Sequence, residues 1–90
     1  MSQSDKDRWS SMGECYDRMA EHFVPRYRML QDEVIALLLA DGKPELLVDL
    51  GAGSGIFIEK FLDASPSSRA VWVDWSKDFR RVATRRLARF

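Results

Sequence analysis

Apolar residues recur every three or four positions along the first half of the chain, a spacing that is typical of amphipathic helices. After a flexible polar arm at residues 1–11, this spacing predicts a short helix over residues 12–24 and a longer helix over residues 26–40. Pro25 separates the two helices because the residue before a proline is disfavoured in the α conformation. The sequence therefore predicts a helical segment over residues 12–44.

The longer helix is expected to bury one face against the rest of the protein. Gln31, Asp32 and Glu33 fall on the opposite face and should be exposed to solvent. Gly42 can take the left-handed conformation that ends a helix, and Pro44 prevents its continuation. The residues expected to face the core are Tyr27, Leu30, Val34, Leu37 and Leu38.

The pattern changes in the second half of the chain. Leu46–Leu50 is a short apolar run between a proline and a glycine, which suits a strand buried on both faces, as in a parallel sheet. Residues 56–62 return to helical spacing, and Ala70–Asp74 forms a second strand-like run. A strand, a helix and a strand in this order predict a βαβ unit within an α/β segment at residues 45–90.

Three glycines, Gly51, Gly53 and Gly55, follow the first predicted strand. Glycine permits positive φ and lets a ligand approach the backbone closely, so this loop is suited to binding. A dinucleotide-binding loop would carry its third glycine where this chain has Ile56. A P-loop would end in a lysine, and the first lysine after these glycines is Lys60. Both phosphate-binding interpretations are therefore disfavoured.

The segment Val48–Gly55 resembles motif I of the class I S-adenosylmethionine-dependent methyltransferases, with Ala52 and Ser54 where many members carry Cys and Thr. Asp74, at the end of the second predicted strand, is similar to the family's acidic residue that accepts hydrogen bonds from both ribose hydroxyls. The two oxygens of a carboxylate suit such a diol. The resemblance implies a Rossmann-like, doubly wound α/β fold, truncated here to an N-terminal helical preamble plus one βαβα unit.

The resemblance also implies S-adenosylmethionine as the cofactor. The glycine loop would pack against its methionyl part, with Asp49 helping to bind the amino group. Trp75 would flank the adenine; the alternative is that it packs on the outer helices. Either Tyr16 or Tyr27 would lie near the cofactor or the acceptor. No catalytic residue is implied. The implied cofactor-binding residues are Asp49, Gly51, Ala52, Gly53, Gly55, Asp74, Trp75 and Tyr16.

The last predicted helix is capped by Ser76 or Asp78 and runs to the end of the chain. Residues 64–90 carry 7 basic and 2 acidic side chains, a net charge of +5, whereas residues 1–63 carry 7 basic and 12 acidic ones, a net charge of −5. No aromatic or base-reading pattern accompanies the basic residues, which favours a solvated face over a nucleic-acid surface. The apolar stripe expected to face the sheet is Phe79, Val82, Ala83, Leu87 and Phe90.

The composition is that of a globular protein, with 46% hydrophobic residues in a chain of 90. Cys15 is the only cysteine, which excludes an internal disulfide and predicts a reducing, cytoplasmic location. No apolar leader or membrane-spanning run is found, so no membrane partner is expected. His22 lacks a partner at triad spacing, and Asp17 and Glu21 lack further ligands for a metal site.

The resemblance covers only the N-terminal portion of the family's domain: the helical preamble, motif I and the acidic second strand. It predicts the cofactor-binding portion of a methyltransferase for a small-molecule acceptor, incomplete for catalysis by itself. Two strands leave a sheet edge unpaired, so we expect a homo-oligomer or a partner chain that completes the sheet. The alternative is a non-catalytic, degenerate subunit that acts through self-association or partner binding. A nicotinamide-dependent oxidoreductase fragment is disfavoured by Ile56.

Overall fold

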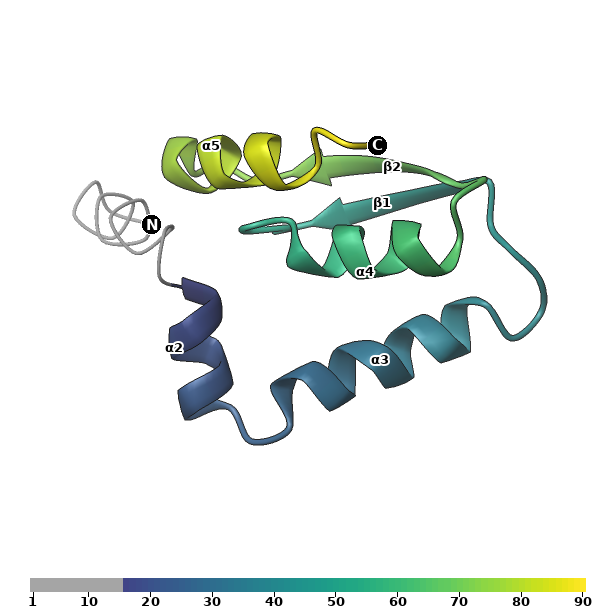
Figure 1. Cartoon of the computed structure of the whole chain (residues 1–90), viewed down its shortest axis with the longest axis horizontal. Helices are drawn as coiled ribbons and strands as arrows, with labels where there is room; N and C mark the ends of the chain where they lie inside the picture. The colour runs from purple at the N-terminus through teal and green to yellow at the C-terminus, as the bar shows by residue number, and fades with distance from the viewer. Residues whose placement is uncertain (1–15) are drawn as a thin grey trace.

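The computed structural model describes residues 16–90 and, within this range, all side chains except those of Tyr16 and Glu21. After two helices the chain alternates between strand and helix, as Figure 1 shows. Predictions for residues 1–15, which include the polar arm and Cys15, lie outside the described residues. The elements in chain order are α2 (Tyr16–Phe23), α3 (Tyr27–Leu38), β1 (Leu46–Leu50), α4 (Ile56–Ala64), β2 (Arg69–Val73) and α5 (Lys77–Arg86).

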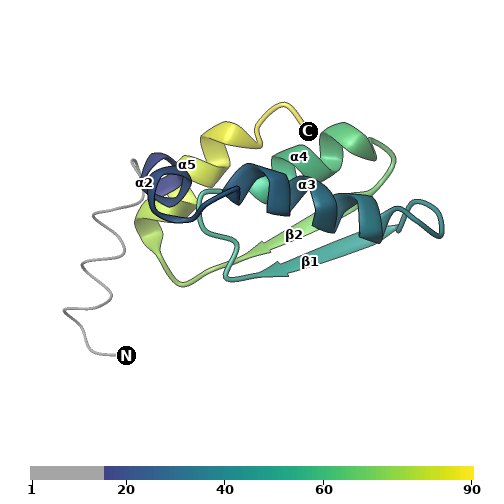
Figure 2. The same ribbon diagram turned by 90° about the horizontal axis from the view of Figure 1, so that it is seen from below.

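The two strands form a parallel sheet. Leu46 lies opposite Arg69 at one end of the pairing, and Leu50 lies opposite Val73 at the other. Parallel strands need a crossover connection, which α4 supplies. Figure 2 shows α2, α3, α4 and α5 on the same side of the sheet. The structure therefore confirms the predicted strand–helix–strand order and an α/β architecture.

The other face of the sheet is open among the described residues. Leu46, Val48 and Leu50 of β1 are 47%, 51% and 77% exposed. Val71 and Val73 of β2 are 43% and 41% exposed. The prediction that the first strand is buried on both faces is therefore wrong for this structure. Side chains alternate between the two faces of a strand, and the described helices cover only one of these faces.

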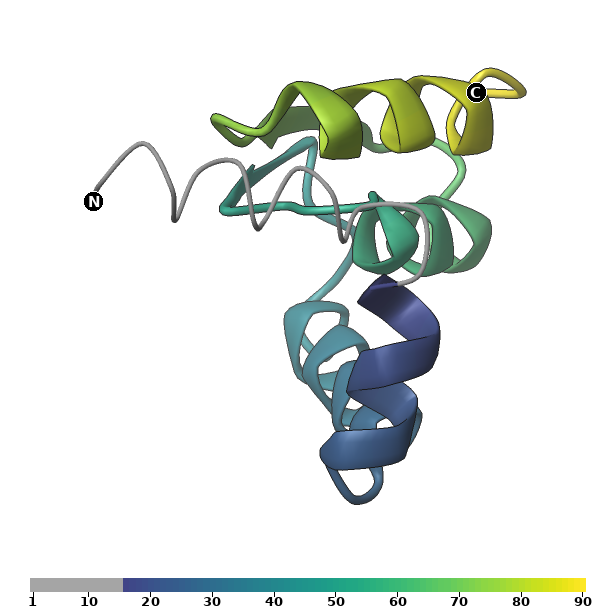
Figure 3. The same cartoon turned by 90° about the vertical axis from the view of Figure 1, so that its left-hand side faces the viewer.

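The core lies between the sheet and the helices and is centred on α4. Ile58, Phe61 and Leu62 of α4 form a buried cluster with Ile35 of α3. Figure 3 shows α4 between α3 and α5, and it contacts both. The helical preamble thus shares one core with the α/β segment.

The face of α3 that is buried differs from the predicted one. Gln31 and Ile35 are buried, whereas Leu30 and Leu37 are 51% and 76% exposed. Of the predicted core residues of this helix, only Tyr27 is half-buried. Residues four apart lie on one helix face, so packing α3 on α4 through Ile35 also buries Gln31.

The ends of two helices also differ from the prediction. α3 is capped by Leu39, and Gly42, the predicted left-handed cap, takes a φ of 113° in the turn that follows. α5 has the predicted cap, Ser76, whose side chain accepts a backbone N–H at 3.1 Å. It ends at Arg86, where a hydrogen-bonded turn redirects the chain, so Phe90 is 48% exposed instead of completing the apolar stripe.

Candidate functional site

The glycine loop joins the carboxyl end of β1 to α4 and bends toward the end of β2. Gly51, Gly53 and Gly55 have φ values of 72°, 56° and 82°. The backbone N–H groups of Gly51 and Ala52 both donate to the carbonyl of Val73, at 2.8 and 3.0 Å. The positive φ values explain why glycine occupies these three positions.

The three glycines differ in what surrounds them. A Cβ atom added at Gly51 or Gly53 would meet nothing within 4 Å, so their backbone borders open space. A Cβ atom at Gly55 would lie 3.1 Å from Cβ of Ala83 and 3.2 Å from Cδ1 of Leu87. Gly51 and Gly53 can therefore admit a ligand, whereas Gly55 allows α5 to pack closely on the loop.

Two side chains at the end of β2 hold Gly53. Its N–H donates to Oδ2 of Asp74 at 2.8 Å, and its carbonyl accepts from Nε1 of Trp72 at 2.7 Å. The N–H of Ser76 donates to Oδ1 of Asp74 at 3.0 Å. Asp74 therefore fixes the loop, a contact that sequence reasoning missed. A carboxylate has about four lone-pair sites, so each oxygen can still accept another hydrogen bond.

A cavity of about 380 Å³ lies between the glycine loop and the preamble helices. Four predicted site residues line it, namely Asp49, Gly51, Ala52 and Gly53. The remaining lining residues, most of which sequence reasoning did not assign to the site, are Asp17, Tyr27, Gln31, Val34 and Leu38 of the preamble and Ser54, Ile56 and Phe57 beside the loop.

Three other predicted site residues, Gly55, Asp74 and Trp75, are not part of the described wall of this cavity. Gly55 contacts α5, Asp74 holds the loop, and Trp75 is 44% exposed at the end of β2. The side chain of Tyr16 lies outside the described residues. Tyr27, the alternative preamble tyrosine, does line the cavity.

Asp49 is the candidate ligand-binding group of the cavity. No described side chain or backbone group forms a hydrogen bond or ion pair with its carboxylate. Burial raises the pKa of Asp49 above its ordinary value, and the negative charge of Asp74 raises it further. Since the described cavity wall includes no Lys, Arg or His side chain, a bound cation would relieve this repulsion.

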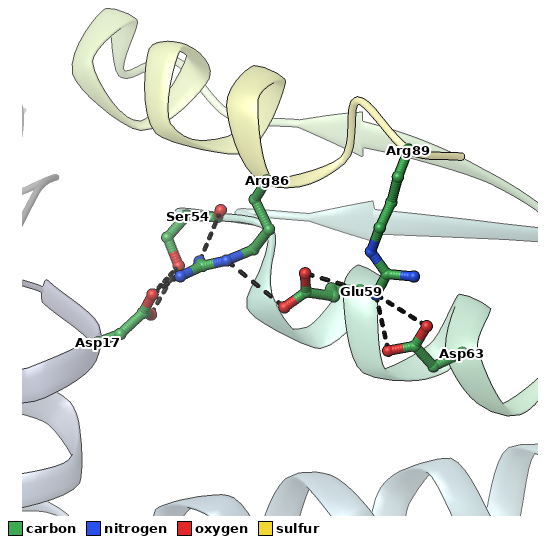
Figure 4. A network of polar contacts seen from close by, with 6 residues as sticks. All are labelled: Asp17, Ser54, Glu59, Asp63, Arg86 and Arg89. Carbon is green, nitrogen blue, oxygen red and sulfur yellow. Dashed lines mark hydrogen bonds and ion pairs between the residues drawn. The ribbon is translucent and has the colours of Figure 1, made fainter.

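A network of charged groups ties α2 to the glycine loop and to α5 (Figure 4). Ser54 Oγ donates to both carboxylate oxygens of Asp17, at 2.6 and 2.7 Å. Nη1 of Arg86 donates to Asp17 Oδ2 at 2.8 Å and to the Ser54 carbonyl at 3.0 Å. Glu59 lies 3.6 Å from Nε of Arg86. This network fixes the position of α2, whose Asp17 lines the cavity.

A second and larger cavity, of about 510 Å³, lies near the start of β2. Its wall includes Leu62, Ala70 and Phe90, and the hydroxyl of Ser68 in this wall is bonded to the carbonyl of Pro44. Ligands of parallel sheets bind beyond the carboxyl ends of the strands, where the smaller cavity lies. We therefore take the smaller cavity as the candidate site.

His22, metal binding and membrane-spanning helices were also considered for residues 16–90. His22 is exposed and contacts Phe23 edge to face, with ring centroids 4.9 Å apart, and it does not line the cavity. No group of three or more His, Cys, Asp or Glu side chains in this range could hold a metal ion. None of its helices has both the length and the apolar character needed to cross a membrane.

Comparisons with protein-family profiles, with curated protein sequences and with solved structures return no match for this chain. The methyltransferase resemblance therefore rests on the residues of the sequence alone.

Proposed function

We propose that this chain is the S-adenosylmethionine-binding N-terminal portion of a Rossmann-like methyltransferase that acts on a small-molecule acceptor. The observation that carries the proposal is the carboxylate of Asp49, which has no hydrogen-bond or ion-pair partner among the described residues and lines a cavity bordered by Gly51 and Gly53. The cavity lies at the carboxyl ends of parallel strands, where α/β folds bind their ligands. A cytoplasmic location stays a prediction.

The residues present fit the cofactor in size and charge. A cavity of about 380 Å³ falls in the range of small-molecule sites. Asp49 would accept hydrogen bonds from the ammonium group, and Gly51 and Gly53 would admit the ligand close to the backbone. The free lone pairs of Asp74 would accept from the ribose hydroxyls, and Trp75 is exposed enough to flank the adenine. The cofactor supplies a methyl group on a sulfonium, while the protein binds and orients it.

Calorimetric titration with S-adenosylhomocysteine tests the proposal. Asp49→Asn should weaken binding by roughly 10- to 150-fold, since a hydrogen bond to a charged group contributes about 1.5–3 kcal/mol. Asp41→Asn is the matched control, because it removes the same charge from an exposed turn outside the cavity. Asp74→Ala should likewise weaken binding more than His22→Ala. Absence of binding by the folded chain, or equal effects of Asp49→Asn and Asp41→Asn, would overturn the proposal.

The open face of the sheet favours a second candidate function, a non-catalytic subunit that acts through self-association. It carries five apolar side chains that are 41–77% exposed, a patch of the kind that marks an interaction surface: Leu46, Val48, Leu50, Val71 and Val73. Light scattering should then give the mass of an oligomer. Leu50→Lys should reduce this mass, whereas Leu37→Lys on the exposed side of α3 should not. A monomeric wild-type chain would reject self-association.

A further inference from the structure

Gln31 has a buried group that nothing in the described structure satisfies. The residue is 8% exposed, and its Oε1 is the one buried side-chain oxygen or nitrogen among the described residues without a hydrogen-bond partner. Buried polar groups in native proteins are nearly always hydrogen-bonded, so an exception requires an explanation. Because Gln31 also lines the cavity beneath the glycine loop, a ligand can supply the missing donor.

The position of Gln31 is fixed by its helix. Ile35, one turn further along α3, is part of the buried core cluster. Nζ of Lys60 on α4 donates to the Arg28 carbonyl at 3.3 Å and pairs with Asp32 at 2.9 Å. These contacts hold α3 against α4 on both sides of Gln31. An apolar side chain would fill this position without leaving an unsatisfied oxygen, so packing alone does not account for a glutamine.

A second acceptor of the cavity, also without a partner among the described residues, indicates which donor fits. Asp49 lines the same cavity, and the described wall includes no cationic side chain. A protonated primary amine carries three N–H donors and one positive charge. It can therefore bond to Asp49 and Gln31 together and offset the negative charge. Val34, Leu38 and Phe57 of the same wall provide contacts for the apolar part of such a ligand.

We infer that Gln31 is a binding residue of this cavity, which accepts a hydrogen bond from the same protonated amine as Asp49. This inference rests on the proposed function, in which the amine is that of the methionyl part of the cofactor. The terminal torsion of a glutamine side chain is broad, so its amide can turn the buried oxygen toward the cavity when a donor enters.

The first test compares two ligands on three forms of the protein by calorimetry. The ligands are S-adenosylhomocysteine and its analogue with hydrogen in place of the α-amino group. Gln31→Leu should lower the affinity for S-adenosylhomocysteine by about tenfold, because one hydrogen bond to a charged group is lost. Its affinity for the analogue should stay within about twofold of the wild-type value. Gln31→Glu keeps an acceptor of the same length and should bind S-adenosylhomocysteine at least as tightly as the wild type. Circular dichroism checks that each variant is folded.

Equal weakening of both ligands by Gln31→Leu would mean that Gln31 acts only through packing and would overturn the inference. Unchanged binding of both ligands would overturn it as well, and so would a loss in Gln31→Glu as large as that in Gln31→Leu.

A second probe separates this inference from the proposed function. Hexylamine and hexanol at millimolar concentration are titrated into the ¹⁵N-labelled chain while the side-chain amide signal of Gln31 is followed. A shift of the Gln31 signal with hexylamine but not with hexanol supports an amine site. If this shift is seen and S-adenosylhomocysteine does not bind, only the proposed cofactor is rejected. If the Gln31 signal responds to neither probe or to both alike, the inference is wrong whatever the fate of the cofactor proposal.

Discussion

The close packing of the glycine loop on α5 predicts that alanine at Gly55 is far more damaging than alanine at Gly53. Gly55 has a φ of 82°, and an alanine Cβ there would lie 3.1 Å from Cβ of Ala83 and 3.2 Å from Cδ1 of Leu87. Left-handed conformation costs a non-glycine residue about 1–2 kcal/mol. Overpacking against α5 adds about 1–3 kcal/mol. The free energy of unfolding should therefore fall by about 2–5 kcal/mol.

Gly53→Ala is the matched control within the same loop. Gly53 also has a positive φ, of 56°, but its added Cβ would meet nothing within 4 Å. Only the conformational cost of about 1–2 kcal/mol should remain. The same Cβ would point into open space beside the candidate site, so this variant should lose ligand affinity while it stays folded.

Urea denaturation followed by circular dichroism measures both changes, and thermal melting provides a check. Since about 1 kcal/mol shifts the melting temperature of a domain of this size by 4–8 °C, Gly55→Ala should melt roughly 8–40 °C below the wild type. Equal destabilisation by Gly55→Ala and Gly53→Ala would refute the close contact between the loop and α5.

Two further predictions concern the charges around the site. Asp49→Asn should raise the free energy of unfolding at pH 7. In the wild type, the raised pKa of Asp49 means that the folded state favours the protonated acid. The contribution of Asp49 to the free energy of unfolding is therefore most favourable below pH 3.8 and is lost as the pH rises through the raised pKa. Urea denaturation at several pH values should show that the stability advantage of Asp49→Asn over the wild type shrinks toward pH 3. An advantage that is independent of pH would contradict the reasoning. Arg86→Gln should cost about 1–3 kcal/mol and speed hydrogen exchange in α2, because it removes the partly buried partner of Asp17. Arg80→Gln on the exposed side of α5 should change the stability by less than about 0.5 kcal/mol, and similar exchange rates in the two variants would argue against the network.

The α/β half of the chain could be predicted well because its signals are local. The first strand occupies Leu46–Leu50 as expected, α4 begins at Ile56, and Ser76 caps α5. Short apolar runs, glycines and a capping serine each determine the secondary structure within a few residues. The corresponding strand, loop and helix start are therefore found where they were expected. The second strand was expected at Ala70–Asp74 but occupies Arg69–Val73, so Asp74 directly follows the strand.

The preamble could be predicted less well because its packing depends on contacts distant in sequence. Hydrophobic spacing alone placed Gln31 in solvent, whereas the contact of Ile35 with α4 buries it. Asp17 and Arg86 are 69 residues apart, and no local pattern indicates that they pair. The part of the cavity wall built by the preamble was therefore mostly missed, whereas four residues on the side of the glycine loop, Asp49, Gly51, Ala52 and Gly53, belong to the predicted set.

An NMR titration of the ¹⁵N-labelled chain with S-adenosylhomocysteine is the most direct test of the central claim. The account predicts saturable shifts of the backbone amides of Asp49 and residues 51–54, together with those of α3 residues that line the same cavity. The amides around the second cavity, such as those of Ala70 and Phe90, should not move. Spectra that do not change, or shifts confined to the second cavity or to the open face of the sheet, would contradict the assignment of the glycine loop as the cofactor site.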